Sequence, residues 1–118
     1  MLLILITIII LSACSNTKEK NKEKYNESIN NVISLEKDRV QELKLERKDI
    51  GIAVFSAGEY IELVYELKSK TISSIYQLDK TNNSYIYLDL NELDNEEEKR
   101  LDEILDKELE YIENLGLK

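Results

Sequence analysis

The sequence contains no histidine, no proline and no tryptophan, and it has a single cysteine. Without histidine, the chain cannot build His/Cys zinc sites, Ser-His-Asp triads or Cys-His nucleophile pairs. One cysteine leaves no disulfide within the chain. Glycine occurs only at positions 51, 58 and 116, so no glycine-rich loop is present to cradle a phosphate. Carboxylates are plentiful, but no pair stands out as general acid and base, and the sequence therefore indicates a non-enzymatic protein without cofactor or metal.

The formal net charge is −8, and the excess of acid lies at one end of the chain. Residues 1–88 carry 12 acidic and 12 basic side chains, whereas residues 89–118 carry 12 acidic and 4 basic ones. Nucleic acid is disfavoured as a partner, because phosphate binding needs a cluster of Lys and Arg. The acidic end either meets a basic partner or keeps the domain soluble, and we favour solubility.

An apolar run from Leu2 to Leu11 is interrupted only by Thr7 and ends in Leu11-Ser12-Ala13-Cys14. This motif resembles the bacterial lipobox. The resemblance implies that residues 1–13 are a lipoprotein signal peptide, that a diacylglycerol lipid, with acyl chains such as palmitate, is attached to the thiol of Cys14, and that the chain is cut just before Cys14. It also implies a protein anchored by lipid to the extracytoplasmic face of the cell membrane.

Two other interpretations of this segment are a transmembrane anchor and an ordinary secretory signal. A spanning helix needs about 20 apolar residues, and this run is much shorter. Its length does match the hydrophobic region of a signal peptide, with small residues before the processing point. No Lys or Arg precedes Leu2, although such signals normally open with positive charge, and we therefore consider a true start codon upstream of Met1.

Residues 14–24 contain no apolar side chain after Cys14 and have no helical or strand period. This composition predicts a flexible polar tether. Its four lysines against two glutamates suit a segment over anionic headgroups, although a simply solvated linker is an equal alternative.

Residues 26–47 have a helical period, and Asn26 is the expected N-cap. The predicted apolar stripe consists of Ile29, Val32, Ile33, Val40 and Leu43. The predicted solvent side consists of Glu36, Lys37, Asp38, Glu42 and Lys44.

From Asp49 onward the chain becomes rich in β-branched and aromatic residues separated by short turns. This pattern predicts four strands, at 50–55, 60–68, 71–79 and 85–88. Connections this short permit only antiparallel neighbours. We therefore expect an α+β fold in which an N-terminal helix packs on a four-stranded antiparallel meander.

The second of these strands alternates between two kinds of side chain, which predicts one buried face. Its odd-numbered residues, from Ile61 to Leu67, should meet the helix. The candidate contact face, if it is exposed, consists of Tyr60, Glu62, Val64 and Glu66. For four other tyrosines we favour cross-strand packing with wet hydroxyls over a ligand platform, namely Tyr65, Tyr76, Tyr85 and Tyr87.

The acidic segment 89–95 is similar to a calcium loop in composition but not in spacing, because Asp94 stands where an EF-hand needs Gly. The segment instead predicts a helix start, with Asp94 as N-cap and Glu97 completing a capping box. An amphipathic C-terminal helix is expected up to Gly116, with its apolar stripe packed on the domain or on a partner. That stripe consists of Leu101, Ile104, Leu105, Ile112 and Leu115.

A helix followed by four strands, behind a lipobox and a Lys/Asn-rich tether, resembles the small cystatin-like fold lipoproteins of low-GC Gram-positive bacteria. The most similar stretches are residues 25–33 and 52–60, and the resemblance covers roughly residues 25–115. It implies a fold more than a function. Protease inhibition is disfavoured, because the turn at residues 55–59 lacks the Gln-x-Val-x-Gly motif of true cystatins.

Together these features predict three segments: a signal peptide over residues 1–13, a lipidated tether over 14–24, and a cystatin-like domain with an acidic C-terminal helix over 25–118. We expect a cell-surface lipoprotein whose domain is a binding or interaction module for a protein partner in the envelope. Two alternatives remain: an accessory component of a conjugation or secretion apparatus, and a carrier or sensor of a small apolar ligand.

Overall fold

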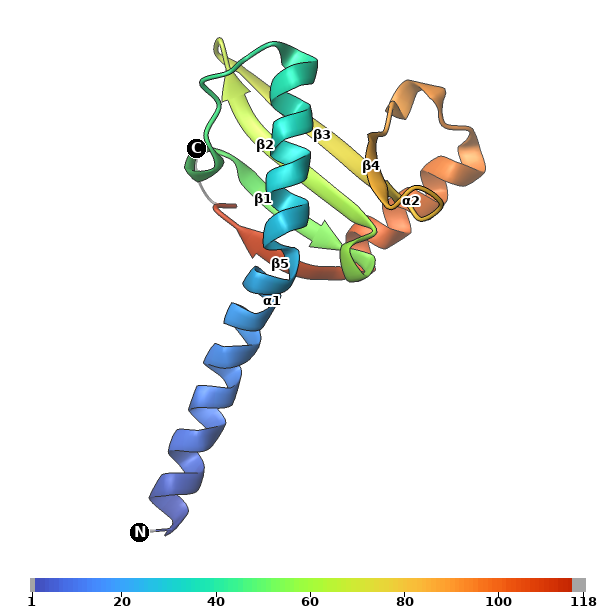
Figure 1. Cartoon of the computed structure of the whole chain (residues 1–118). Coiled ribbons are helices and arrows are strands. Elements are labelled where there is room, and N and C mark those ends of the chain that lie inside the picture. Colours follow the sequence, from blue (N-terminus) through green and yellow to red (C-terminus); the bar gives the residue numbers. More distant parts are fainter. Residues whose placement is uncertain (1, 116–118) are drawn as a thin grey trace.

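The computed structural model describes the backbone of residues 2–115 and the side chains of residues 20–115. Over these residues the chain forms two α-helices, five strands and three short 3₁₀ helices (Figure 1). In chain order they are α1 (Leu2–Val40), η1 (Arg47–Asp49), β1 (Gly51–Phe55), η2 (Ser56–Gly58), β2 (Tyr60–Leu67), β3 (Lys70–Asp79), β4 (Ser84–Tyr87), η3 (Leu90–Glu92), α2 (Asn95–Lys107) and β5 (Leu109–Glu113).

The strands form one antiparallel sheet in the order β4-β3-β2-β1-β5. The first four strands follow one another as hairpins, which confirms the predicted meander. The predicted α+β class, with an N-terminal helix on an antiparallel sheet, is also confirmed. The number of strands is five rather than four.

The fifth strand corrects the prediction that one helix runs to Leu115. Helix α2 ends at Lys107, and the chain then pairs with β1 as β5. All five residues of β1 are buried, so β1 is a central strand that needs a neighbour on both edges. Tyr111 is buried opposite Val54, whereas Ile112 is half exposed. Gly116, the predicted C-terminal cap, lies outside the described residues.

Helix α1 also departs from the predicted bounds of residues 26–47. Gln41 adopts a left-handed conformation with φ 57° and ends the helix after Val40. Leu43, predicted on the apolar stripe, is therefore 79% exposed, and Leu45 is buried instead. These two corrections have one cause, because a left-handed residue redirects the chain and resets the helical period.

At its other end α1 continues through the segment predicted as a tether, and in Figure 1 it projects from the domain as a stalk. Residues 14–24 lack an apolar stripe, but Lys and Glu are good helix formers. Opposite charges three positions apart, as at Glu19 and Lys22 or Lys20 and Glu23, also favour helix. Asn26 is thus an interior residue of α1 and not its N-cap.

The main core lies between α1 and one face of the sheet. Ile29, Val32 and Ile33 of α1 pack in one cluster with Ile52, Ile61 and other side chains of the central strands. Ile61, Leu63 and Tyr65 are buried, which confirms that the odd-numbered face of β2 meets the helix.

Helix α2 covers part of the opposite face. Leu101 is buried in a second cluster with Phe55, Tyr60 and Ile75. Asp94 caps α2 in the predicted capping box. The Asp94 side chain accepts a hydrogen bond from the Glu97 backbone N–H, and the Glu97 side chain accepts one from the Asp94 backbone N–H. The C-terminal helix therefore packs on its own sheet. Within the described part of the chain, no helix combines the length and the apolar character needed to cross a bilayer.

Candidate functional site

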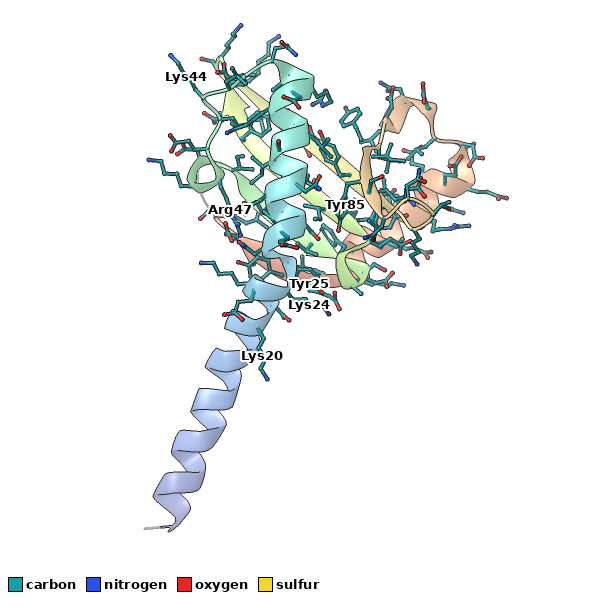
Figure 2. All side chains as sticks on the ribbon, viewed as in Figure 1. Lys20, Lys24, Tyr25, Lys44, Arg47 and Tyr85 are labelled. Carbon is teal, nitrogen blue, oxygen red and sulfur yellow. The ribbon has the colours of Figure 1, made fainter. Side chains whose placement is uncertain are left out.

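Cys14 lies on the stalk part of α1, outside the domain. Tyr25 is the first buried side chain among those described, and Cys14 precedes it by 11 positions. Lys20 and Lys24 are exposed on the intervening turns (Figure 2). The side chains of Leu11, Ser12, Ala13 and Cys14 lie outside the described ones, so their predicted role as a lipobox stays a prediction.

Helix α2 covers one end of the candidate contact face on β2. Tyr60 is only 8% exposed, because it packs against Leu101, so it does not belong to an open surface. Glu62 and Val64 are half-buried, and Glu66 is exposed. The Ser73 hydroxyl donates to Glu62 at 3.0 Å. Only the last three residues remain candidates for contact with a partner.

The most concentrated polar site is centred on Glu36, a residue that the sequence placed on the solvent side of the helix. That prediction is wrong, because Glu36 is 0% exposed. Its Oε1 accepts from Arg39 Nε at 3.0 Å and from the Tyr76 hydroxyl at 2.7 Å. Its Oε2 accepts from Arg39 Nη2 at 2.8 Å, Ser74 Oγ at 2.6 Å and the Tyr65 hydroxyl at 2.5 Å.

These contacts fix the charge state of the site. Burial alone would raise the pKa of Glu36, but hydrogen bonds from Arg39, Ser74 and the two tyrosines outweigh it and lower the pKa to about 2. Burial, together with hydrogen bonding to the Glu36 carboxylate, raises the pKa of Tyr65 and of Tyr76. Glu36 is therefore ionised and the tyrosines are neutral at physiological pH.

Five donors saturate the carboxylate, which has about four lone-pair sites. It has no free position to take a proton from a substrate or to bind an ion. The arrangement instead fixes α1 on β2 and β3. The sequence did contain a signal for it, because Glu36 follows Ile29, Val32 and Ile33 at spacings of seven, four and three, and so lies on the buried stripe.

A second polar cluster joins the turn after α1 to β5. Arg47 donates to Glu113 from Nε at 2.7 Å and from Nη2 at 2.8 Å, and its Nη1 donates to Asn26 at 2.6 Å and Asn30 at 3.0 Å. The Arg47 hydrogen bonds lower the pKa of Glu113 despite its partial burial. The cluster thus ties α1 and β5 together. Figure 2 labels Arg47 beside α1.

Tyr25, at the base of the stalk, makes a related contact with β5. Its hydroxyl donates to Glu110 at 2.7 Å. Burial, and to a lesser extent this hydrogen bond, raises the pKa of Tyr25 to about 12. Its ring also lies beside Gly58, where a Cβ atom would come within 3.2 Å of Tyr25 Cε1. The stalk therefore enters the domain at a rigid junction.

Tyr65, Tyr76, Tyr85 and Tyr87, the four tyrosines for which cross-strand packing was predicted, are mainly structural. Tyr65 and Tyr76 are buried as predicted, but their hydroxyls bind Glu36 rather than water. The Tyr85 hydroxyl donates to the Gly58 carbonyl at 2.5 Å. Tyr87 is 39% exposed, and its ring contacts Arg39, with Cζ at 4.1 Å from the ring centroid.

A surface cavity of about 390 Å³ lies along the β3–β4 hairpin. Its lining includes Gln77, Ile86 and Leu88, together with the charged side chains of Glu59 and Lys80. A smaller hollow of about 90 Å³ between this hairpin and α2 shares Gln77 and Leu88. Neither was predicted from the sequence, because each joins segments that lie apart in the chain: Glu59 with the hairpin in the cavity, and α2 with the hairpin in the smaller hollow.

The described residues contain no group of three or more acidic or cysteine side chains placed to hold a metal ion. The acidic segment considered for calcium instead supplies caps. Asp89 accepts from the Asn91 backbone N–H at 3.0 Å, and Asp94 caps α2.

Comparisons with protein-family models, with curated proteins and with solved structures gave no match.

Proposed function

We propose that this chain is a bacterial lipoprotein, anchored through acyl chains on Cys14 to the extracytoplasmic face of the cell membrane. Its cystatin-like domain over residues 25–118 is a non-enzymatic interaction module for a protein partner in the envelope. The observation that carries the proposal is the position of the lipobox motif, on a stalk that contributes nothing to the described core before Tyr25.

The stalk has the geometry that this function needs. Removal of residues 1–13 leaves every described core side chain in place, because the first of them is Tyr25. At 1.5 Å per residue, the helix from Cys14 to Tyr25 holds the domain about 16 Å from its anchor. Lysines on this stretch favour anionic headgroups, whereas the acidic α2 region favours solvent.

The polar clusters support a binding role over catalysis. Glu36 and Glu113 are each held by an arginine and by tyrosine, and neither lines the cavity at β3 and β4. The oxygens of both carboxylates already accept hydrogen bonds from these side chains, so they are not available to act as a general acid or base. Surfaces available to a partner are the cavity and the open part of the second sheet face.

A carrier of a small apolar ligand has less support. Such a ligand would occupy the space between α1 and the sheet, and side chains of both layers pack together there in one cluster. Interiors packed in this way leave little room for a ligand without displacement of core side chains.

The test uses the full chain with a C-terminal tag, expressed in a Gram-positive host and labelled with an alkyne fatty acid. The wild-type protein should carry the label and sediment with membranes. Cys14→Ala should lose the label and leave the membrane fraction, while Ser15→Ala, the matched neighbour, should behave as wild type. Membrane retention of unlabelled Cys14→Ala would contradict the anchor.

The interaction module is tested on the same cells by chemical crosslinking and affinity capture. One reproducible envelope protein crosslinked to the wild type, and lost with Cys14→Ala, supports the module. Capture of bulk envelope proteins alone, at equal yield from both forms, would contradict it.

A further inference from the structure

The two edge strands of the sheet, β5 and β4, differ in the features that prevent an edge from pairing with another strand. The β5 edge carries Glu110 and Glu113, and its pairing with β1 shifts register between Val54 and Phe55. Charges and irregular register are common ways to prevent an edge from pairing with another strand. The β4 edge, Ser84–Tyr87, contains no charge, no proline and no register shift.

The register of the β3–β4 hairpin identifies the backbone groups at this edge. The Leu88 N–H donates to the Ile75 carbonyl at 2.8 Å, and Gln77 pairs with Ile86. In an antiparallel ladder every second residue bonds to the neighbouring strand. Ile86 and Leu88 therefore bond to β3, and the backbone N–H and C=O groups of Tyr85 and Tyr87 point away from it. The edge offers two donors and two acceptors.

Both tyrosines are held in place by their side chains. The Tyr85 hydroxyl donates to the Gly58 carbonyl, and the Tyr87 ring lies against Arg39 and 5.7 Å from the Tyr76 ring. The edge is therefore preorganised, which lowers the conformational entropy that β4 itself must lose when a partner strand binds.

The surroundings define the side chains that a partner strand would carry. Ile86, which is 54% exposed, lines the cavity of about 390 Å³ together with Leu78 and Leu88, and these three side chains suit an apolar side chain, whereas Glu59, Asp79 and Lys80 supply charge to the same lining. Arg39, whose guanidinium lies against the Tyr87 ring, is paired with Glu36. Between residues 79 and 97 the only base is Lys80, which pairs with Glu59 at 3.8 Å. The six acids in that range are Asp79, Asp89, Glu92, Asp94, Glu96 and Glu97.

We propose that the β4 edge binds an extended segment of a partner polypeptide that pairs with Tyr85 and Tyr87, places an apolar side chain in the adjacent cavity, and carries basic residues on either side. This inference rests on the proposed interaction function and names its surface and the chemistry of its partner. A second copy of the chain is the less complementary occupant, because each copy brings a net charge of −8 and the same acidic region.

The experiment selects a display library of random nine-residue peptides against the immobilised full chain in detergent. Enriched peptides should combine an apolar centre with flanking Lys or Arg. A synthetic peptide from this pool should bind Ile86→Lys at least about tenfold more weakly than wild type, a change of 1.4 kcal/mol. Binding should survive in Ile112→Lys, the matched control, because Ile112 is a similarly exposed isoleucine (48%) on the other edge strand.

Amide exchange in the wild-type protein gives a readout that does not depend on any variant folding. The peptide should slow exchange at Tyr85 and Tyr87 and leave Glu110 unchanged. Absence of enrichment, equal binding to both variants, protection at β5, or selection of acidic peptides would overturn the proposal. Dimerisation that Ile86→Lys abolishes, without peptide binding, would overturn it in favour of a second copy. None of these results alters the lipid labelling of Cys14, so the two proposals fail separately.

Discussion

The carboxylate of Glu36 on α1 accepts a hydrogen bond at 2.7 Å from the hydroxyl of Tyr76 on β3, a residue 40 positions away. Both side chains are almost fully buried. Arg39 supplies the countercharge from the next turn of the same helix and remains 34% exposed. The contact fixes how α1 lies on the sheet, and therefore the direction in which the stalk leaves the domain.

Replacement of Glu36 by alanine should lower the free energy of unfolding by about 3–5 kcal/mol, because it leaves Arg39 and three hydroxyls without their acceptor. Urea denaturation followed by circular dichroism measures this change. Asp38→Ala is the control, since Asp38 is an exposed acid on the same helix and should change stability by less than about 0.5 kcal/mol. Equal effects of the two variants would show that the Glu36 network contributes no specific stability.

The low pKa of Glu36 gives a second expectation. Because the folded pKa of about 2 lies below the usual 4.5, the ionised carboxylate stabilises the fold above pH 4.5. This contribution is lost as the pH falls from 4.5 towards 2. The difference in unfolding free energy between wild type and Glu36→Gln should thus be constant near pH 7 and shrink below pH 4.5. A difference that does not vary with pH would contradict the assigned ionisation.

The ion pair between Arg47 and Glu113 should hold β5 against the domain. Arg47→Lys keeps the charge but loses the bidentate geometry and the contacts to Asn26 and Asn30. We expect a loss of about 1–2 kcal/mol and faster hydrogen exchange in residues 109–113. Lys48→Ala is the control, because that side chain is 76% exposed. Unchanged exchange in β5 would mean that strand pairing alone holds it.

The capping box of α2 gives a smaller effect. Asp94→Ala removes the acceptor for the Glu97 N–H and should destabilise the protein by about 1 kcal/mol, measured as a fall in thermal midpoint. Asp102→Ala, an exposed position inside the same helix, should have little effect. If both variants melt at the same temperature, the cap does not contribute to stability.

Much of the domain was predictable, because its strands and the start of α2 are encoded locally. Alternation along β2 predicted which face meets α1, and Asp94 with Glu97 predicted the helix start. The predictions that were wrong concern elements whose structure depends on contacts with distant parts of the chain. Residues 109–113 are compatible with helix or strand, and only the open edge of β1 selects strand.

The polar site was missed for a similar reason. Glutamate is usually exposed, and its burial at position 36 is favourable only because Tyr65, Ser74 and Tyr76 arrive from strands far along the chain. The end of α1 depended on the backbone of Gln41, a residue with no strong preference for the left-handed conformation that it adopts. The hollow of about 90 Å³ likewise requires the β3–β4 hairpin and α2 to be placed together.

An acylated stalk should carry the binding domain, and mass spectrometry of the protein extracted from membranes measures this acylation. We expect an N-terminal peptide that begins at Cys14 and carries a diacylglycerol thioether, with residues 1–13 absent. A membrane-extracted protein with a peptide spanning Ala13 and Cys14, and with a free thiol, would contradict it.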